Sequence, residues 1–369
     1  MDLEFSPRQH ALRRSVKALL ASFDNLSRNG CSSTRWEALA RGGVFRAGLP
    51  IRVGGSADPI DTMIVAEELG WALAAEAYPD TVVVAGSLLA NAPNAQFDHL
   101  VKRIVSGAAL VAVAWDEPGE RCGADTCLIA TPTATGWRLD GRKPLVAGAA
   151  AAEHWIVEAH IETVGRERAL FVVGWDEAGI ERIDYPTIDG RQSSDVRLSG
   201  VEVAAQQLIV GPESTRCVVD YAIDAMIAAH CAEAVGVMRR MLADTIAHCK
   251  QRQQFGQPLS SFQVLQHRMV DMDLQIAMAA SASLRASLSL DLPPEERARA
   301  MSAAKVTVAT AGRFIGENAI QLHGGLGMRD ETPVTHYFRR TIAMESELGG
   351  IDWHLDRFAR HSAAVESQP

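Results

Sequence analysis

The strongest constraint on the fold of this chain is a helical pattern that runs unbroken from Val218 to His248. Apolar residues recur there at the spacing of an α-helix. The segment exceeds a typical globular helix in length, and this is typical of a helical bundle. Three further helical segments follow at residues 262–290, 294–323 and 333–364. We therefore expect residues 213–369 to form a C-terminal four-helix-bundle domain.

The chain before the bundle divides into two parts of different character. Residues 1–108 show helical periodicity, and the first helix is expected to have Ser6 as its N-cap and Pro7 at its first position. Residues 109–212 hold short segments rich in Val, Ile, Trp and Thr that are separated by turns. This pattern predicts an antiparallel β domain.

The predicted fold class is α+β, mostly α, with an N-terminal helical domain (1–108), a central antiparallel β domain (109–212) and a C-terminal four-helix bundle (213–369). Alanine, the strongest helix former, is abundant, and aromatic residues make up only 6% of the chain. The predicted N-terminal helices cover residues 6–23, 35–47 and 61–73, and the predicted strands cover 110–115, 127–131, 136–139, 154–159 and 169–173.

Composition excludes several classes of function. The net charge of −9 argues against a nucleic-acid groove lined with lysine and arginine. The mean hydropathy is +0.00, and no uncharged apolar run approaches the ~20 residues of a transmembrane helix. The first residues, Met1-Asp2-Leu3-Glu4, do not resemble a signal peptide, and the six cysteines are scattered. We expect a cytoplasmic protein without a membrane span.

No metal site is predicted. Cys122 and Cys127 would be half of a site, but no second cysteine pair follows them. His230 and Glu233 lie on one helix without a matching carboxylate and histidine pair on a second helix. We therefore expect His230 to be a packed helix residue.

Two clusters in the C-terminal half carry chemistry that binds anions. The first, Arg252-Gln253-Gln254-Phe255-Gly256, lies between two predicted helices, where an arginine can contact phosphate bidentately. The second, Gln321-Leu322-His323-Gly324-Gly325-Leu326-Gly327, is a glycine-rich segment that can expose several backbone N–H groups. Taken singly, the first is also consistent with a solvated helix connection and the second with a helix C-cap.

Taken together, the two clusters resemble the flavin-dependent acyl-CoA dehydrogenases. The resemblance rests on Arg252-x-x-Phe255-Gly256, Phe262-Gln263-x-x-Gln266-His267-x-x-x-Asp271-Met272, Gln321-x-x-Gly324-Gly325-x-Gly327 and Arg339, and on Pro50, Gly54-Gly55 and Glu67-Glu68-Leu69-Gly70. It covers essentially the whole chain and is most specific in the C-terminal half. It implies the helical, β, helical order of domains.

The resemblance also implies a cofactor, a substrate and an assembly. Family members bind FAD between subunits, act on acyl-CoA thioesters and are usually tetramers. Arg252 and Phe255 would lie near the pyrophosphate and adenine of a neighbouring subunit's FAD. Gln321, Gly324 and Gly325 would contact the adenosine half of the same cofactor. A cation and backbone N–H groups that face a diphosphate are chemically suited to this role.

The base that the reaction needs is not at its usual place. Removal of an α proton and a β hydride needs a carboxylate near the α carbon. A gap-free count from Arg339 places Leu348 at the position of the family's glutamate, whereas a slip of one residue makes Glu347 the base. Without the slip, Glu347 is a solvated charge. An alternative base position on the long helix holds Met226, and Asp224 lies half a turn before it.

The β domain departs from the family at the flavin ring. A pattern similar to Thr-Glu-Pro-x-x-Gly-Ser-Asp falls at Trp115–Asp125, where Ala124 replaces the serine. Leu145 and Ala147 stand where the family has a Trp and a Thr that contact the ring. Ala147 has no side-chain donor. Residues that hold the FAD tail are thus present, while residues that hold the ring are replaced.

Three functions remain open from the sequence. The first is an FAD-dependent acyl-CoA dehydrogenase that acts in β-oxidation-type catabolism of lipids or steroids, active as a homotetramer with Glu347 as the base. The second is a non-catalytic subunit that completes the FAD site of a related partner, as in heteromeric bacterial enzymes of steroid side-chain degradation. The third is another flavin chemistry that needs no carboxylate base, which Leu145 and Ala147 disfavour.

Overall fold

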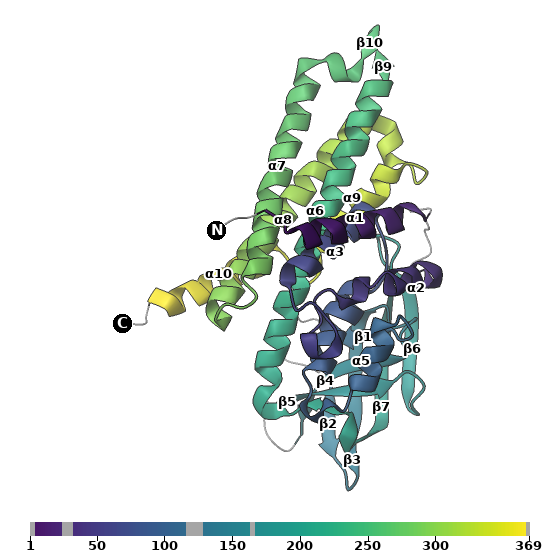
Figure 1. Ribbon diagram of the computed structural model, residues 1–369, viewed down its shortest axis with the longest axis vertical. Helices are drawn as coiled ribbons and strands as arrows, with labels where there is room; N and C mark the ends of the chain where they lie inside the picture. Colours follow the sequence, from purple (N-terminus) through teal and green to yellow (C-terminus); the bar gives the residue numbers. More distant parts are fainter. Residues whose placement is uncertain (1–3, 24–31, 116–127, 163–166, 367–369) are drawn as a thin grey trace. The chain divides into compact units, whose positions relative to one another are not determined.

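The computed structural model describes residues 4–23, 32–115, 128–162 and 167–366 (Figure 1). The chain divides into two compact units. One, the helical unit, comprises Met1–Arg28, Pro59–Ala74 and Ile227–Pro369; the other, the sheet unit, comprises Asn29–Asp58 and Ala75–Met226. The boundary near residue 226 lies inside a single long helix. The domain boundaries expected at residues 108 and 212 stay a prediction.

The sheet unit has short helices before its strands. The helices are α2 (Ser33–Arg41), η1 (Val44–Arg46), η2 (Ile51–Val53), the π-helix η3 (Tyr78–Gly86), α4 (Ser87–Ala90), η4 (Pro93–Ala95) and α5 (Asp98–Val105), and η5 (Ala205–Gln207) lies between the last two strands. The helix expected at 35–47 is therefore shorter, since it ends at Arg41 and a 3-10 turn follows. Gly43, with a φ of +73°, separates the two.

The strands form one mixed sheet in the order β6-β7-β3-β2-β4-β5-β8, with β1 paired to β4. Their bounds are β1 (Val111–Ala114), β2 (Ile129–Pro132), β3 (Gly136–Ala147), β4 (His154–Ile161), β5 (Arg168–Gly174), β6 (Ile180–Pro186), β7 (Gln192–Ala204) and β8 (Leu208–Val210). Most pairs are antiparallel, as expected, but β4 pairs in parallel with both β1 and β2. Residue alternation indicates which face of a strand is buried but does not specify its neighbour. Trp155, Phe171 and Leu139 are fully buried in the core of this sheet.

The helical unit contains the predicted bundle. Its elements are α1 (Pro7–Ala21), α3 (Pro59–Trp71), part of α6 (Pro212–Gln251), the hairpin β9 (Gln253–Gln254) and β10 (Gln257–Pro258), η6 (Leu259–Ser261), α7 (Gln263–Leu288), α8 (Pro294–His323), η7 (Gly324–Met328), α9 (Pro333–Ser346) and α10 (Ile351–Glu366). The hairpin joins the end of α6 to α7 (Figure 1), and α8 packs against α7, α9 and α10. The N-cap of α1 is Ser6, as predicted, in a capping box with Gln9.

The single helix expected over residues 333–364 was wrong. The chain forms two helices, because α9 ends at Ser346 and α10 begins at Ile351. Leu348 and Gly349 between them have φ values of +59° and +97°, in the left-handed region that stops a helix. A Cβ on Gly349 would lie 2.5 Å from the Trp353 ring, so only glycine fits this turn. The break matters because it places Glu347 at the C-cap of α9.

The length and apolar composition of α6 would allow it to cross a membrane. However, 94% of its most apolar window is buried within the protein. Such burial is typical of a core helix.

Two glycines allow α3 and α6 to touch through their backbones. A Cβ on Gly236 would lie 1.9 Å from the carbonyl oxygen of Glu67, and a Cβ on Gly70 would lie 2.0 Å from the carbonyl oxygen of Glu233. Real Cβ atoms do not come this close to another atom, so any side chain here must separate the two helices. The contact also fixes the position of Glu233 along α6.

The variant Gly236→Ala is expected to lower the free energy of unfolding by about 1–3 kcal/mol, because the added methyl group forces a backbone shift in a packed interface. Urea denaturation measures this change. The matched control is Gly312→Ala in α8, where the new Cβ meets its nearest atom at an ordinary 3.6 Å. The control is expected to be neutral or slightly stabilising, since alanine favours helix over glycine. Equal effects of the two variants would contradict the close contact.

Candidate active site

Glu347 lies where α9 ends, and its two carboxylate oxygens face different side chains. Arg340 Nη1 donates to Glu347 Oε1 at 2.8 Å. His230 Nδ1, from α6, lies 3.3 Å from Glu347 Oε2. The Glu347 side chain is 36% exposed. The hydrogen bond from Arg340 fixes its orientation, and the side chain is partly exposed although Oε2 is buried.

Arg340 is the centre of this arrangement. Its side chain is only 1% exposed. Its Nε donates to Glu233 Oε1 at 3.0 Å, and its Nη2 donates to Glu233 Oε2 at 3.2 Å. Such a bidentate pair holds both partners in one geometry. One guanidinium thus serves two carboxylates, and we call Glu233, Arg340, Glu347 and His230 the Arg340 cluster.

His230 is packed within α6, as predicted, and it also faces Glu347. Burial lowers the pKa of His230 to about 4, although the neighbouring Glu347 carboxylate acts in the opposite direction. The imidazole is therefore neutral near pH 7. Burial likewise raises the pKa of Cys231, the next residue, to about 12, so this cysteine is a thiol.

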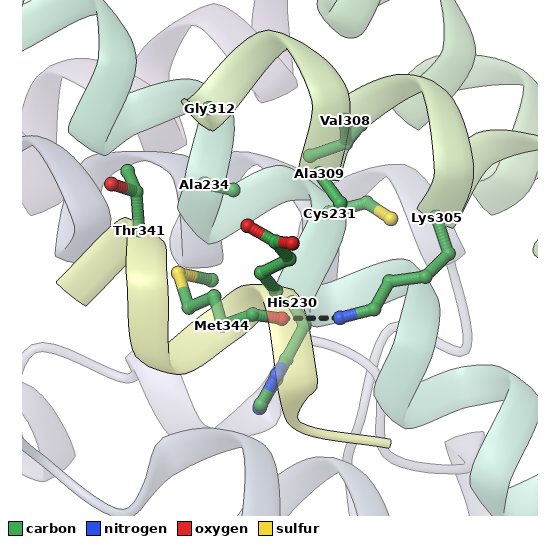
Figure 2. A pocket seen from close by; sticks show the side chains of 10 residues that line it. His230, Cys231, Ala234, Lys305, Val308, Ala309, Gly312, Thr341 and Met344 are labelled. Carbon is green, nitrogen blue, oxygen red and sulfur yellow. Dashed lines mark hydrogen bonds between the residues drawn. The ribbon is translucent and has the colours of Figure 1, made fainter. Parts of the chain in front are cut away.

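A small cavity of about 20 Å³ lies beside His230, between α6, α8 and α9 (Figure 2). It is lined by His230, Cys231, Ala234, Lys305, Val308, Ala309, Gly312, Thr341, Met344 and Glu345. Lys305 donates to the Met344 carbonyl, the dashed contact in Figure 2. Burial lowers the pKa of Lys305. A volume of this size holds about one water molecule, so it is not the space for a thioester substrate.

The other predicted base positions carry no usable acid. Leu348, at the gap-free base position, has an apolar side chain, and its carbonyl oxygen accepts a hydrogen bond from His354 Nε2 at 3.0 Å. Met226 and Ile227 on α6 are both buried and have apolar side chains. Asp224 is a carboxylate, but only 1% of it is exposed. Of the residues considered from the sequence, Glu347 alone combines a carboxylate with exposure.

His354 links the turn after α9 to α8. It is fully buried, and its Nδ1 lies 3.3 Å from the Ser302 hydroxyl, which donates to it when Nε2 carries the proton for Leu348. Burial, followed by the charge of Lys305, lowers the pKa of His354 to about 3. The folded protein therefore keeps this imidazole neutral over a range where an unfolded chain would protonate it.

Acid is expected to destabilise the protein through His354. Its folded pKa lies below the unfolded value near 6.5, so the stability it contributes is complete above pH 6.5 and is lost as pH falls toward 3. The loss is about 1.4 kcal/mol per pH unit for one such group. His354→Gln keeps a donor for Leu348 and should reduce this slope in urea titrations at several pH values. The matched control is His267→Gln, at an exposed histidine, and an equal change of slope in both variants would contradict the role of His354.

The residues predicted to hold the FAD tail come together at one end of the helical unit. The rings of His248 and His323 stack at 4.4 Å, which brings the end of α6 to the end of α8. Arg252 lies four residues after His248, and Gly324 directly follows His323. The Arg252 cluster and the glycine cluster are therefore neighbours, although residues 257–320 lie between them in the sequence.

The exposure of these residues fits an anionic dinucleotide. Arg252, Gln321, Gly324 and Gly325 are exposed, and Phe255 is 90% exposed in a left-handed conformation. No protein atom lies within 4 Å of the Cβ position of Gly324 or Gly325. Within the described ranges Arg252 has no ion-pair partner. An exposed guanidinium, an amide and open backbone supply the donors that a diphosphate and an adenosine need.

The ring-side position has a different character. Leu145 lies at an irregularity of β3, with a φ of +53°, and is 55% exposed. Its backbone N–H donates to Asp195 Oδ1 at 3.1 Å, and the Tyr185 hydroxyl donates to the same oxygen at 2.7 Å. Ala147 is exposed two residues later. The segment Asp116–Asp125 lies outside the described residues, as do Cys122 and Cys127.

Sequence reasoning missed Glu233 and Arg340 as site residues. Arg340 follows the motif residue Arg339, and Glu233 lies three residues after His230 on a face that is otherwise apolar. The available signal was that Glu233 and Arg340 each place a charge on a largely apolar helix face. A buried charge needs a partner, so the two could have been paired.

Comparison with known proteins defines the class. The family described as Acyl-CoA dehydrogenase, C-terminal domain, matches residues 218–363. Acyl-CoA dehydrogenase FadE27 of Mycobacterium tuberculosis is 27% identical over 339 residues, which cover 89% of this chain and 87% of that protein. The resemblance to the acyl-CoA dehydrogenases is thereby confirmed, and residues 218–363 match the C-terminal domain of that family.

Solved structures share the fold over the whole chain. A chain of the ChsE4-ChsE5 complex from Mycobacterium tuberculosis aligns with a TM-score of 0.89 at 23% identity. The alignment covers 100% of this chain and 100% of that chain. The Tcur3481-Tcur3483 steroid ACAD, in its G363A variant, aligns with a TM-score of 0.87 at 25% identity and covers 98% of this chain and 99% of its own. The fold is that of acyl-CoA dehydrogenases, a class that implies a flavin cofactor and oligomeric assembly.

Proposed function

We propose that this protein is an FAD-dependent acyl-CoA dehydrogenase, which removes hydrogen from the α and β carbons of an acyl-CoA thioester. The observation that carries the proposal is the partly exposed carboxylate of Glu347, which accepts a hydrogen bond from a buried guanidinium and lies beside a neutral imidazole. The match to the acyl-CoA dehydrogenase C-terminal domain and the similarity to FadE27 support the same reaction.

The residues of this chain would act as follows. Glu347 accepts the α proton on a carboxylate oxygen while the Cα–Cβ double bond forms. FAD, when bound, supplies the acceptor for the β hydride. Arg340 and His230 hold the carboxylate in place before the substrate arrives. Arg252, Phe255, Gln321, Gly324 and Gly325 would bind the tail of FAD, which in a tetramer belongs partly to a neighbouring subunit.

The spectrum of the purified chain tests this proposal. We expect a yellow protein. The visible absorbance of its oxidised flavin should bleach when an acyl-CoA is added under anaerobic conditions. A panel of straight-chain and steroid side-chain thioesters would identify the preferred substrate. A protein that binds FAD but bleaches with none of them would contradict the proposal.

A second candidate is a partner subunit that completes the FAD site of a related catalytic chain in a heterotetramer of the cytoplasm. Leu145, Ala147 and Leu348 favour it, since all three are apolar where the family has functional side chains. The ChsE4-ChsE5 complex is an assembly of unlike subunits with this fold. A colourless protein that gains flavin only on co-expression with a related chain would support this candidate, and turnover by the isolated chain would exclude it.

A further inference from the structure

Glu347 shares its cation with a second carboxylate. The guanidinium of Arg340 faces Glu233 with Nε and Nη2 and faces Glu347 with Nη1. Glu233 is 4% exposed and Glu347 is 36% exposed. Glu233, the more buried carboxylate, makes the bidentate contact, and Glu347, the more exposed one, accepts from Nη1. The positive charge of Arg340 beside Glu347 is thus offset by the negative charge of Glu233.

We propose that Glu233, acting through Arg340, sets the basicity of Glu347, and that His230 fixes the orientation of its carboxylate. Both are positioning residues, and the inference rests on the proposed role of Glu347 as the base. A guanidinium that served Glu347 alone would stabilise the carboxylate and make it a poor proton acceptor. The negative charge of Glu233 offsets that stabilisation while the hydrogen bond from Arg340 remains.

The contact with His230 has a complementary role. The imidazole lies on α6 beside the Glu347 oxygen that Arg340 does not contact. A neutral ring 3.3 Å from this oxygen confines the carboxylate without adding a positive charge. The cluster thus confines the base by one hydrogen bond from a cation and by one neutral ring close to the other oxygen.

Other charges surround the cluster, and each comes from an identified element. Lys305 of α8 acts on His230 and is itself affected by Glu347 and Glu345. Glu345 of α9 is paired with Arg313, at 2.5 Å and 3.0 Å. Lys305 and Arg357 of α10 both act on His354. A single change at Glu233 leaves these groups in place. The direction of the expected shift in the pKa of Glu347 therefore follows from Coulomb's law.

Titration of Glu347 in the full-length protein tests the proposal without substrate. The carboxyl carbon of Glu347 is followed by ¹³C NMR in glutamate-labelled protein and assigned by its loss in Glu347→Gln. In Glu233→Gln, the measured pKa of Glu347 should fall by about one unit, because the negative charge of Glu233 no longer offsets the positive charge of Arg340. Glu233→Asp keeps the charge and should return most of the shift. An unchanged or higher pKa in Glu233→Gln would overturn the proposal.

Two further variants make the test specific. Glu345→Gln removes a carboxylate from the same helix that does not contact Arg340, and its effect on Glu347 should be less than half as large. An equal effect would mean that general charge, not the shared guanidinium, controls Glu347. His230→Leu should lower kcat several-fold with little change in KM, while His230→Asn, which keeps a donor, should recover part of it. No recovery with Asn would overturn the role of His230.

The same variants separate this inference from the proposed function. If the protein bleaches with acyl-CoA, the acid limb of the kcat/KM profile of Glu233→Gln should move to lower pH, in parallel with the NMR titration. If no thioester is oxidised but the NMR shift is seen, the charge relation holds and the proposed reaction fails. If turnover occurs and neither readout shifts, the reaction stands and the inference is wrong.

Discussion

Glu347→Gln is expected to lower turnover by about 10²–10⁴-fold, the usual contribution of a general base, while FAD remains bound. The amide can still accept a hydrogen bond from Arg340 Nη1, which contacts Glu347 at 2.8 Å in the native protein. It cannot take the α proton. Stopped-flow bleaching of the bound flavin by an acyl-CoA measures the chemical step, and the absorbance before mixing reports how much flavin is bound.

Glu345→Gln is the matched control for this experiment. Glu345 lies two residues earlier on α9, and its carboxylate pairs with Arg313 rather than with the Arg340 cluster. The control should retain most of the activity. Normal turnover in the isolated Glu347→Gln protein would remove Glu347 as the base and assign that role to another group of the same chain.

Arg340→Met is expected to lower the free energy of unfolding by about 3–5 kcal/mol, because it leaves the buried carboxylate of Glu233 without its partner. Glu233 is 4% exposed, so water cannot replace the lost guanidinium. Equilibrium urea denaturation measures the change, with far-UV circular dichroism and tryptophan fluorescence as separate probes. Coincident transitions would confirm that one free energy describes the unfolding.

The double variant Glu233→Leu/Arg340→Met is the control. Replacement of a buried ion pair by apolar residues of similar size is often neutral, so the double variant should recover most of the stability lost in Arg340→Met. It should not recover turnover, since Glu347 then lacks its hydrogen-bonded cation. A double variant as unstable as the single one would show that Arg340 acts through packing and not through Glu233.

Much of the helical unit could be predicted because its signals are local. The bounds of α8 agree with the predicted 294–323, and the N-cap at Ser6 is confirmed. Periodicity and capping involve residues within a few positions of one another, and the sequence shows these directly. The break between α9 and α10 was missed, because the apolar spacing continues past Glu347 while two residues of the turn adopt left-handed conformations.

The sheet was predicted in part. Five strands were expected near their actual positions, but β6, β7 and β8 were not identified, and the parallel pairs of β4 were not foreseen. Pairing depends on residues far apart in the chain, since β3 pairs with β7. Alternation of apolar residues carries information on faces and none on partners.

By itself, the sequence determined the class of this protein and the residues that resemble an FAD-binding tail site. It also identified Glu347 as one of several candidates for the catalytic base. Only the tertiary structure decided that Arg340 lies between Glu233 and Glu347, because residues 107 positions apart meet there. A buried cation acts on whatever folding brings within a few ångströms. Local sequence therefore indicates that a charge needs a partner, and the packing of α6 against α9 decides which partner it has.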